Sequence, residues 1–304
     1  MADLLSVEPK SAFVDAENGC LHYLAWDAGA SASEEDEIPL VLLHGLAATA
    51  DTWRLVADSL EQQHQLVAFD LPGHGLSDPA NDYALATVTE DVVSGMAALG
   101  LGQVALVGHG YGARVALALT ARHPALVSHL VLVDMPLIEP RHWPGMTRER
   151  FIRQSMPREC FASRAAFLQA MQQEMADFWS PEVEAIVLAS IRVLADGTVE
   201  ERLRAEDQRR IRETLWEDRA LSYYGKVACP VLLVPAAASP QEGEAPPEQL
   251  ERAEDFSLAK GYMAVQVARA IRHCTIHWVP ETTHDIQLQR PQRLAAAIAS
   301  FVRE

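Results

Sequence analysis

The sequence is poor in cysteine and in basic residues, and it lacks a long apolar run. Its 304 residues include four cysteines, none in a Cys-x-x-Cys pair, which indicates reduced thiols in a cytoplasmic protein. Only 25 lysines and arginines stand against 42 acidic residues, and the net charge of −17 disfavours nucleic acid and anionic membranes as partners. No apolar segment is long enough to span a bilayer. Residues 1–5 lack the basic start of a secretory signal peptide, and we expect none.

Hydrophobic residues make up 49% of the sequence, enough for a large core. Uninterrupted apolar runs of strand length alternate with helical patterns in the first half of the chain. The runs are 39–43, 66–69, 104–107 and 130–133. Strands that alternate with helices at this spacing predict right-handed crossovers. We therefore predict an α/β fold with a doubly wound, mostly parallel sheet, whose site lies beyond the carboxyl ends of the strands.

The pattern changes after the fourth run. Residues 136–225 are rich in arginine and glutamate and have helical periodicity, which predicts a helical cap inserted over the carboxyl edge of the sheet. Residues 1–135 would then form the first part of the core, and residues 226–304 the second part. A strand signal at 231–234 opens this second part, and an amphipathic helix at 291–302 closes it.

A glycine-rich pentapeptide, Gly108-His109-Gly110-Tyr111-Gly112, directly follows the strand signal at 104–107, and a helix of small residues begins at once. A strand, a tight turn and a helix in this order are the context of a nucleophile elbow, in which the middle residue of G-x-S-x-G stands at the tip of the turn. Here the middle residue is Gly110. Because glycine has no side chain, the turn is expected to form without an attacking atom.

The order of the motifs resembles the α/β-hydrolase superfamily. His44-Gly45-Leu46 follows one predicted strand, the turn-rich segment 70–78 follows the next, and the elbow and a late histidine come after them. The resemblance covers about residues 40–134 and the chain from 227 onwards. It implies a hydrolase of this fold that acts on small molecules without a cofactor. The same fold also hosts lyases and non-catalytic receptors, so the fold alone does not decide the function.

The resemblance assigns a base and an acid to this chain. The catalytic histidine of the family falls on His284, just after the final predicted strand. The usual acid position follows the strand at 231–234, but no carboxylate stands there. Asp134, at the end of the strand after the elbow helix, matches an alternative acid position of some members and is the preferred candidate. Glu242 and Glu244 are weaker candidates, because their loop is long and polar.

The resemblance also assigns groups that would hold a substrate. The oxyanion donors of the family correspond to the backbone N–H groups of Leu46 and Tyr111. His44, Trp143 and Phe151 are the candidates for the wall of the substrate pocket. The histidines and cysteine between residues 273 and 277 do not have a standard zinc spacing, so we expect neither a metal nor a cofactor.

Gly110 leaves three hypotheses open. The first is a hydrolase for an ester, thioester or related small apolar carbonyl or halo compound, whose Ser or Asp nucleophile is replaced and whose activity is reduced or lost. The second is a non-catalytic binding or regulatory protein that uses the capped pocket as a receptor. In the third, His284 acts as a general base on water or on a substrate C–H, which gives hydrolysis without a nucleophile or lyase-type chemistry. The sequence does not indicate an oligomeric state.

Overall fold

The computed structural model describes residues 8–27, 38–135, 137–153 and 161–303. The expectations for residues 1–5 and for Cys160 lie outside these ranges. Within them, Cys20, Cys229 and Cys274 form no disulfide. None of the described helices is both long enough and apolar enough to cross a membrane.

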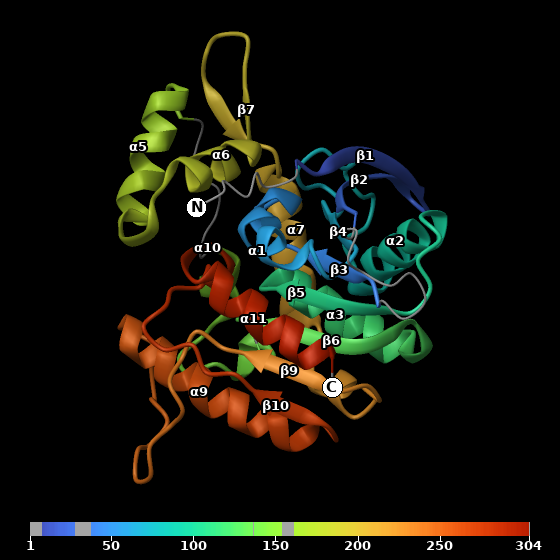
Figure 1. Ribbon diagram of the computed structural model, residues 1–304. Coiled ribbons are helices and arrows are strands. Elements are labelled where there is room, and N and C mark those ends of the chain that lie inside the picture. The colour runs from blue at the N-terminus through green and yellow to red at the C-terminus, as the bar shows by residue number, and fades with distance from the viewer. Residues whose placement is uncertain (1–7, 28–37, 136, 154–160, 304) are drawn as a thin grey trace, which may run out of the picture.

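An eight-stranded sheet forms the centre of the molecule, with the strand order β1-β2-β4-β3-β5-β6-β9-β10 (Figure 1). The strands are β1 (Lys10–Ala16), β2 (Gly19–Trp26), β3 (Leu40–Leu43), β4 (Leu66–Phe69), β5 (Val104–His109), β6 (Val127–Val133), β9 (Val231–Val234) and β10 (Cys274–Ile276). β2 pairs antiparallel with both β1 and β4, and the pairs from β4 to β10 are parallel. This arrangement confirms the predicted α/β fold with a mostly parallel sheet.

The apolar strands are uninterrupted because both faces of the sheet are covered. In β3, Leu40 and Leu42 pack in one core with helices α1 and α11, while Val41 and Leu43 pack in the other with α2, α3 and α9. All four side chains are fully buried. The five helices are α1 (Arg54–Leu60), α2 (Leu85–Ala98), α3 (Tyr111–Arg122), α9 (Ala253–Ala270) and α11 (Pro291–Val302). The parallel strands therefore end at one common edge, where their loops meet.

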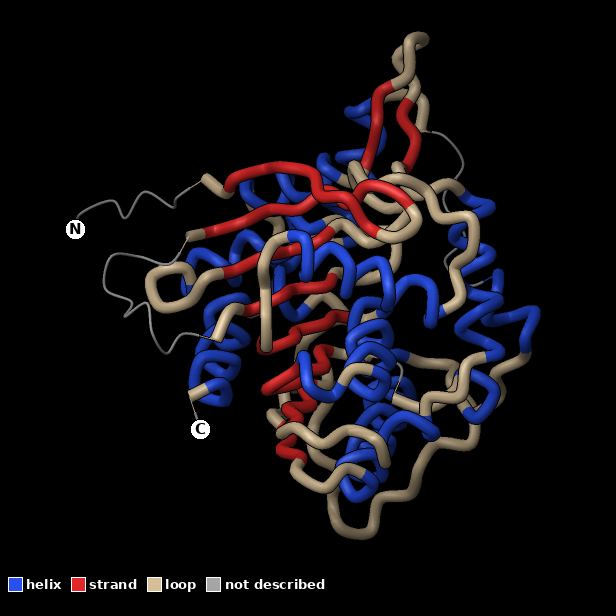
Figure 2. Tube along the Cα trace, turned by 90° about the vertical axis from the view of Figure 1, so that its right-hand side faces the viewer, coloured by secondary structure: helices blue, strands red, loops and turns tan. Residues whose placement is uncertain are grey.

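The segment between β6 and β9 has a small core of its own, built from Phe167, Val183, Val187, Ile191 and Val199. Its elements are α4 (Arg148–Arg153), α5 (Arg164–Glu174), α6 (Pro181–Ala189), β7 (Ile191–Val193), β8 (Val199–Glu201), α7 (Ala205–Glu217) and α8 (Leu221–Tyr224). The described part of this segment is mostly helical, and β7 and β8 add an antiparallel hairpin that was not predicted from the sequence. Figure 2 shows this hairpin projecting away from the main sheet.

Several short helices complete the described chain. They are α10 (Ile286–Gln289) and four 3-10 turns, η1 (Ala50–Trp53), η2 (Pro124–Leu126), η3 (Pro140–His142) and η4 (Ala176–Phe178). α10 follows the loop that carries His284 and leads into α11, where Pro291 occupies the first helical turn.

Candidate active site

Gly110 links the end of β5 to the start of α3 in a tight turn. Its backbone has φ 53° and ψ −112°, a conformation that strains any residue with a Cβ. The N–H of Gly110 donates to the carbonyl of Val133 at 3.0 Å, which fixes the turn to β6. A Cβ on Gly112 would lie 2.4 Å from the carbonyl oxygens of Leu43 and His44, so glycine is required where the loop after β3 crosses the elbow. The turn therefore has the tight shape that the glycine pattern predicts.

His284 faces this turn. A Cβ placed on Gly110 would lie 3.0 Å from Nε2 of His284 and 3.6 Å from Cα of Gly45. Three distant segments of the chain, the loop after β3, the elbow and the loop before α10, thus meet at one point. The side chain of His284 is 52% exposed, and it lines a cavity together with Gly110. The imidazole is therefore accessible to a small molecule.

The other ring nitrogen of His284 binds Asp134, which follows the last residue of β6. Nδ1 of His284 lies 2.7 Å from Oδ2 of Asp134, and the N–H of Ala236 donates to Oδ1 at 2.9 Å. Asp134 has a φ of 38°, a left-handed conformation that Asp tolerates better than most residues. Because a carboxylate accepts at Nδ1, the proton resides there and Nε2 presents its lone pair to the elbow. This is the arrangement that a general base needs.

Lys260 on α9 is a third member of this cluster. Its Nζ lies 2.6 Å from Oδ2 of Asp134, the same oxygen that His284 contacts. Burial by itself would raise the pKa of Asp134, but Lys260 and His284 outweigh burial and hold this pKa well below its usual range. Burial alone would lower the pKa of His284, whereas the hydrogen bond and the charge of Asp134 raise it, against a smaller opposing effect of Lys260. Asp134 therefore stays ionised beside a histidine whose basicity it increases.

His109 of the elbow holds the loop of His284 in place. Its Nε2 lies 3.0 Å from the carbonyl oxygen of His284, and the two ring centroids are 4.4 Å apart. Burial lowers the pKa of His109 to about 4, so the ring is neutral and donates its Nε2 proton to that carbonyl. The elbow thus fixes the backbone of the residue whose side chain faces it.

The residues expected to provide oxyanion donors border the same cavity. Leu46 follows β3, Tyr111 is the first residue of α3, and both line the cavity beside Gly110. The first N–H groups of a helix have no partner within the helix, so the N–H of Tyr111 suits an anionic oxygen. The hydroxyl of Tyr111 is buried, and burial raises its pKa. This phenol therefore stays protonated at neutral pH and is unsuited to be a nucleophile.

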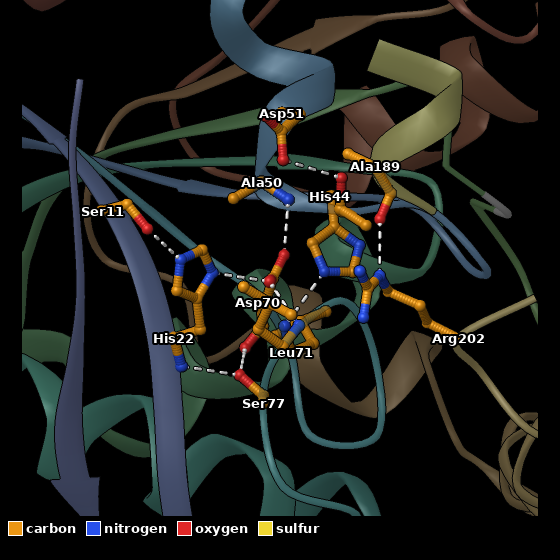
Figure 3. A network of polar contacts seen from close by, with 12 residues as sticks. Ser11, His22, His44, Ala50, Asp51, Asp70, Leu71, Ser77, Ala189 and Arg202 are labelled. Atoms are coloured by element: carbon orange, nitrogen blue, oxygen red, sulfur yellow. Dashed lines mark hydrogen bonds and ion pairs between the residues drawn. The ribbon is translucent and has the colours of Figure 1, made fainter. Parts of the chain in front are cut away.

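A buried polar network supports the loop that carries Leu46 (Figure 3). Oδ1 of Asp70 accepts from the N–H of Ala50 at 2.7 Å, and Nε2 of His44 accepts from the N–H of Leu71 at 3.0 Å. The loops after β3 and β4 are thereby bound to each other. His44 is fully buried and does not line the cavity, which corrects the expectation of a pocket residue. Its role is to join the two loops, because burial keeps the imidazole neutral by lowering its pKa.

The cavity has a volume of about 570 Å³ and lies between the elbow and the inserted segment. Apolar side chains from α4 to α7 line part of it, namely Phe151, Phe167, Met171, Ile186, Val187 and Leu215, and the wall also contains the polar side chains of Glu174, Glu201, Gln208 and Arg212. Phe151 thus lies where the sequence placed it. Trp143 does not, because it borders a separate small hollow near Leu250 and Met263 of the α9 region. Among the residues that the structure describes, no three His, Cys, Asp or Glu side chains gather as a metal site.

The chain is similar to known proteins in sequence and in structure. The profile of the alpha/beta hydrolase fold family matches residues 38–224, more than half of the chain. Putative carbamate hydrolase RutD of Klebsiella pneumoniae (strain 342) is 31% identical over 204 residues, covering 65% of this chain and 72% of that protein. Epoxide hydrolase 3 of Xenopus tropicalis is 31% identical over 45% of this chain and 36% of its own length. The crystal structure of E-2-(acetamidomethylene)succinate hydrolase superposes with a TM-score of 0.76 at 19% identity, over 97% of this chain and 100% of that one.

Proposed function

The chain belongs to the alpha/beta hydrolase fold family, and we propose that it hydrolyses a small ester, thioester or related carbonyl compound by activating water through His284, without a covalent intermediate. The observation that carries the proposal is the position of Nε2, which faces the elbow, borders the cavity and lies 3.0 Å from where a Cβ of residue 110 would stand. The residue that usually attacks is replaced by Gly110, while the base and its acid partner keep a tight geometry. The cytoplasm is the proposed compartment, because of the cysteine usage. Residues 136–225 are the proposed cap over the site.

The proposed reaction has two proton transfers. Nε2 of His284 takes a proton from water, and the water oxygen adds to the substrate carbonyl carbon. The N–H groups of Leu46 and Tyr111 stabilise the resulting oxyanion. The oxyanion then collapses to a carboxylic acid, the C–O or C–S bond breaks, and the imidazolium gives its proton to the departing oxygen or sulfur, which leaves as the alcohol or thiol. Asp134 stabilises the imidazolium between these steps.

Glycine at position 110 favours this route for a steric reason. A side chain there would crowd Nε2 of His284, since even its Cβ would lie only 3.0 Å away. Gly110 leaves this side of the imidazole accessible to a molecule as small as water. Sites of this type that lack their nucleophile retain about 10³- to 10⁴-fold catalysis over water from binding and the oxyanion hole. A positioned general base typically contributes about 10²- to 10⁴-fold.

The test is the hydrolysis of p-nitrophenyl acetate and of a short aryl thioester by the parent protein, by His284→Ala and by a control. His273→Ala is the matched control, because His273 is an exposed histidine of the turn before β10. We expect the parent and the control to have equal kcat/KM, and His284→Ala to lose about 10²-fold or more. Equal rates for the parent and His284→Ala would overturn the proposal. Thermal stabilisation by these compounds without any turnover would instead identify a binding protein.

A further inference from the structure

Arg212 on α7 brings to the cavity wall a positive charge that no described carboxylate pairs with. Its guanidinium lies over the ring of Phe151, with Cζ 5.4 Å from the ring centroid, and Nη1 donates to the carbonyl of Phe151 at 2.9 Å. Nε is buried and meets no acceptor among the described residues. A guanidinium has five N–H donors, and the only hydrogen bond of Arg212 to a described residue is the one from Nη1 to Phe151.

Arg114, a second arginine of the same cavity, has a carboxylate partner of the kind that Arg212 lacks among the described residues. Nη1 of Arg114 lies 3.2 Å from Oδ2 of Asp218, so this buried cation has a carboxylate partner. Arg212 forms no ion pair with a described residue, and burial alone lowers its pKa to about 10. Glu174 and Glu201 also border the cavity, but neither contributes to this shift. Arg212 is thus still charged at neutral pH, and a half-buried guanidinium that has no carboxylate partner among the described residues suits an anionic ligand.

We propose that Arg212 binds a carboxylate group of the substrate, so that the preferred substrates are half-esters, or the corresponding thioesters and amides, of dicarboxylic acids. The catalytic part rests on the proposed function, whereas the binding of a carboxylate does not. A guanidinium holds a single carboxylate through two parallel N–H bonds. A phosphate would bring nearly twice the charge into a cavity that also contains Glu174 and Glu201, so a monoanion is the better match.

The position of Arg212 orients such a substrate. Arg212 belongs to α7 of the inserted segment, whereas Gly110 and His284 belong to the loops at the end of the sheet, and the cavity lies between them. A bound carboxylate would direct the other end of the molecule towards His284. Leu215 and Phe167 line the same cavity and suit the methylene chain between the two ends. The positive charge of Arg212 also attracts an anionic substrate into a protein whose net charge of −17 otherwise repels anions.

Binding is tested first, without any reaction. Melting temperatures of the parent, Arg212→Gln, Arg212→Lys and Arg209→Gln are measured with 10 mM succinate, glutarate or adipate, and with the dimethyl esters. Arg209 is the matched control, an exposed arginine of α7 that pairs with Glu213 on the surface. We expect at least one dicarboxylate to stabilise the parent and Arg209→Gln, with the effect lost in Arg212→Gln and partly kept in Arg212→Lys. No stabilisation of the parent, or one that persists in Arg212→Gln, overturns the proposal.

Hydrolysis is tested next with mono-p-nitrophenyl glutarate and its neutral counterpart of equal length, p-nitrophenyl pentanoate. We expect Arg212→Gln to raise KM for the half-ester about 10- to 100-fold and to leave the neutral ester within about 3-fold. Equal losses for both esters would assign Arg212 a merely structural role and overturn the proposal. If no ester is hydrolysed while dicarboxylates still bind through Arg212, the proposed function fails and the carboxylate site stands.

Discussion

In the part of the chain that the structure describes, two His–Asp pairs with a buried carboxylate have the same contact distance. Nδ1 of His22 lies 2.7 Å from Oδ2 of Asp70, and Nδ1 of His284 lies 2.7 Å from Oδ2 of Asp134. The side chains of the first pair are 3% and 2% exposed, whereas those of the second are 52% and 1% exposed. The distance therefore does not distinguish a fully buried pair from one whose histidine is accessible.

The second nitrogen of each ring makes the difference. Nε2 of His22 lies 2.8 Å from the hydroxyl of Ser11, so both nitrogens of this ring have protein partners (Figure 3). Nε2 of His284 faces Gly110 and the cavity. The same pair thus connects strands in one place and presents a base in the other. Access at Nε2, and not the strength of the Asp contact, decides which role is available.

The largest expected effect is on stability. His22→Ala leaves Asp70 buried without its strongest partner, so we expect the free energy of unfolding to fall by about 3–5 kcal/mol. His284→Ala leaves Asp134 paired with Lys260, and we expect a loss below about 1 kcal/mol. Urea unfolding of both variants measures the difference. Equal losses in the two variants would contradict the division into a structural and an accessible pair.

Gly110→Ser should turn the accessible pair into part of a complete triad. The variant must adopt φ 53° with a Cβ, and His284 must shift by a few tenths of an ångström, so we expect a loss of about 1–3 kcal/mol in unfolding free energy. The hydroxyl introduced at position 110 should react with a fluorophosphonate, so that one label is bound per protein molecule. Gly110→Ala is the control, because it has the same backbone strain and no hydroxyl. Labelling of the parent or of Gly110→Ala would show that the nucleophile lies elsewhere.

The smallest effect concerns the pH profile. His284 must be neutral to accept a proton, so the rate rises with pH through its pKa, which Asp134 raises above the ordinary value while Lys260 opposes this. His284 is also near Asp285, which raises its pKa, and near the neutral His109. Removing the Lys260 charge should therefore move the rising limb to higher pH.

Lys260→Gln is compared with Lys226→Gln, which changes an exposed lysine, by measuring kcat/KM between pH 5 and pH 9. We expect the midpoint to rise by about half a unit in Lys260→Gln only, since a screened charge contributes less than one pK unit. A shift to lower pH would show that the charge of Lys260 raises the pKa of His284, which contradicts the inferred lowering.

The main sheet and the tight turn at its edge could be predicted because local sequence determines them. Strands covered on both faces must be apolar throughout, and the Gly108–Gly112 pattern permits one tight turn. Two hairpins were missed although each has a strong turn signal. β1 and β2 are joined through Glu17-Asn18, directly before Gly19, and β7 and β8 enclose Asp196-Gly197. The first strands of the two hairpins, β1 and β7, are largely exposed, so hydrophobicity alone did not reveal these pairings.

Lys260 and Arg212 could not be found from the sequence, for a different reason. Lys260 meets Asp134 across 126 residues of chain, and nothing near either residue indicates this contact. Arg212 lies on an amphipathic helix with several other arginines, and only the packed structure shows that it faces a cavity while Arg209 faces solvent. Trp143 was predicted in the pocket wall and lies elsewhere. A large apolar residue of the insertion fits equally well in a cavity wall or in a core, so its sequence position does not decide between them.

The most direct measurement is the intact mass of the parent protein, quenched in acid while it turns over p-nitrophenyl acetate. If His284 activates water, turnover proceeds without a burst of nitrophenol, and the protein keeps its unmodified mass at every time point. Gly110→Ser, quenched in the same way, should accumulate one acetyl group. An acetylated parent that forms and decays at the rate of turnover would contradict the account, because a side chain of the protein would then be the nucleophile.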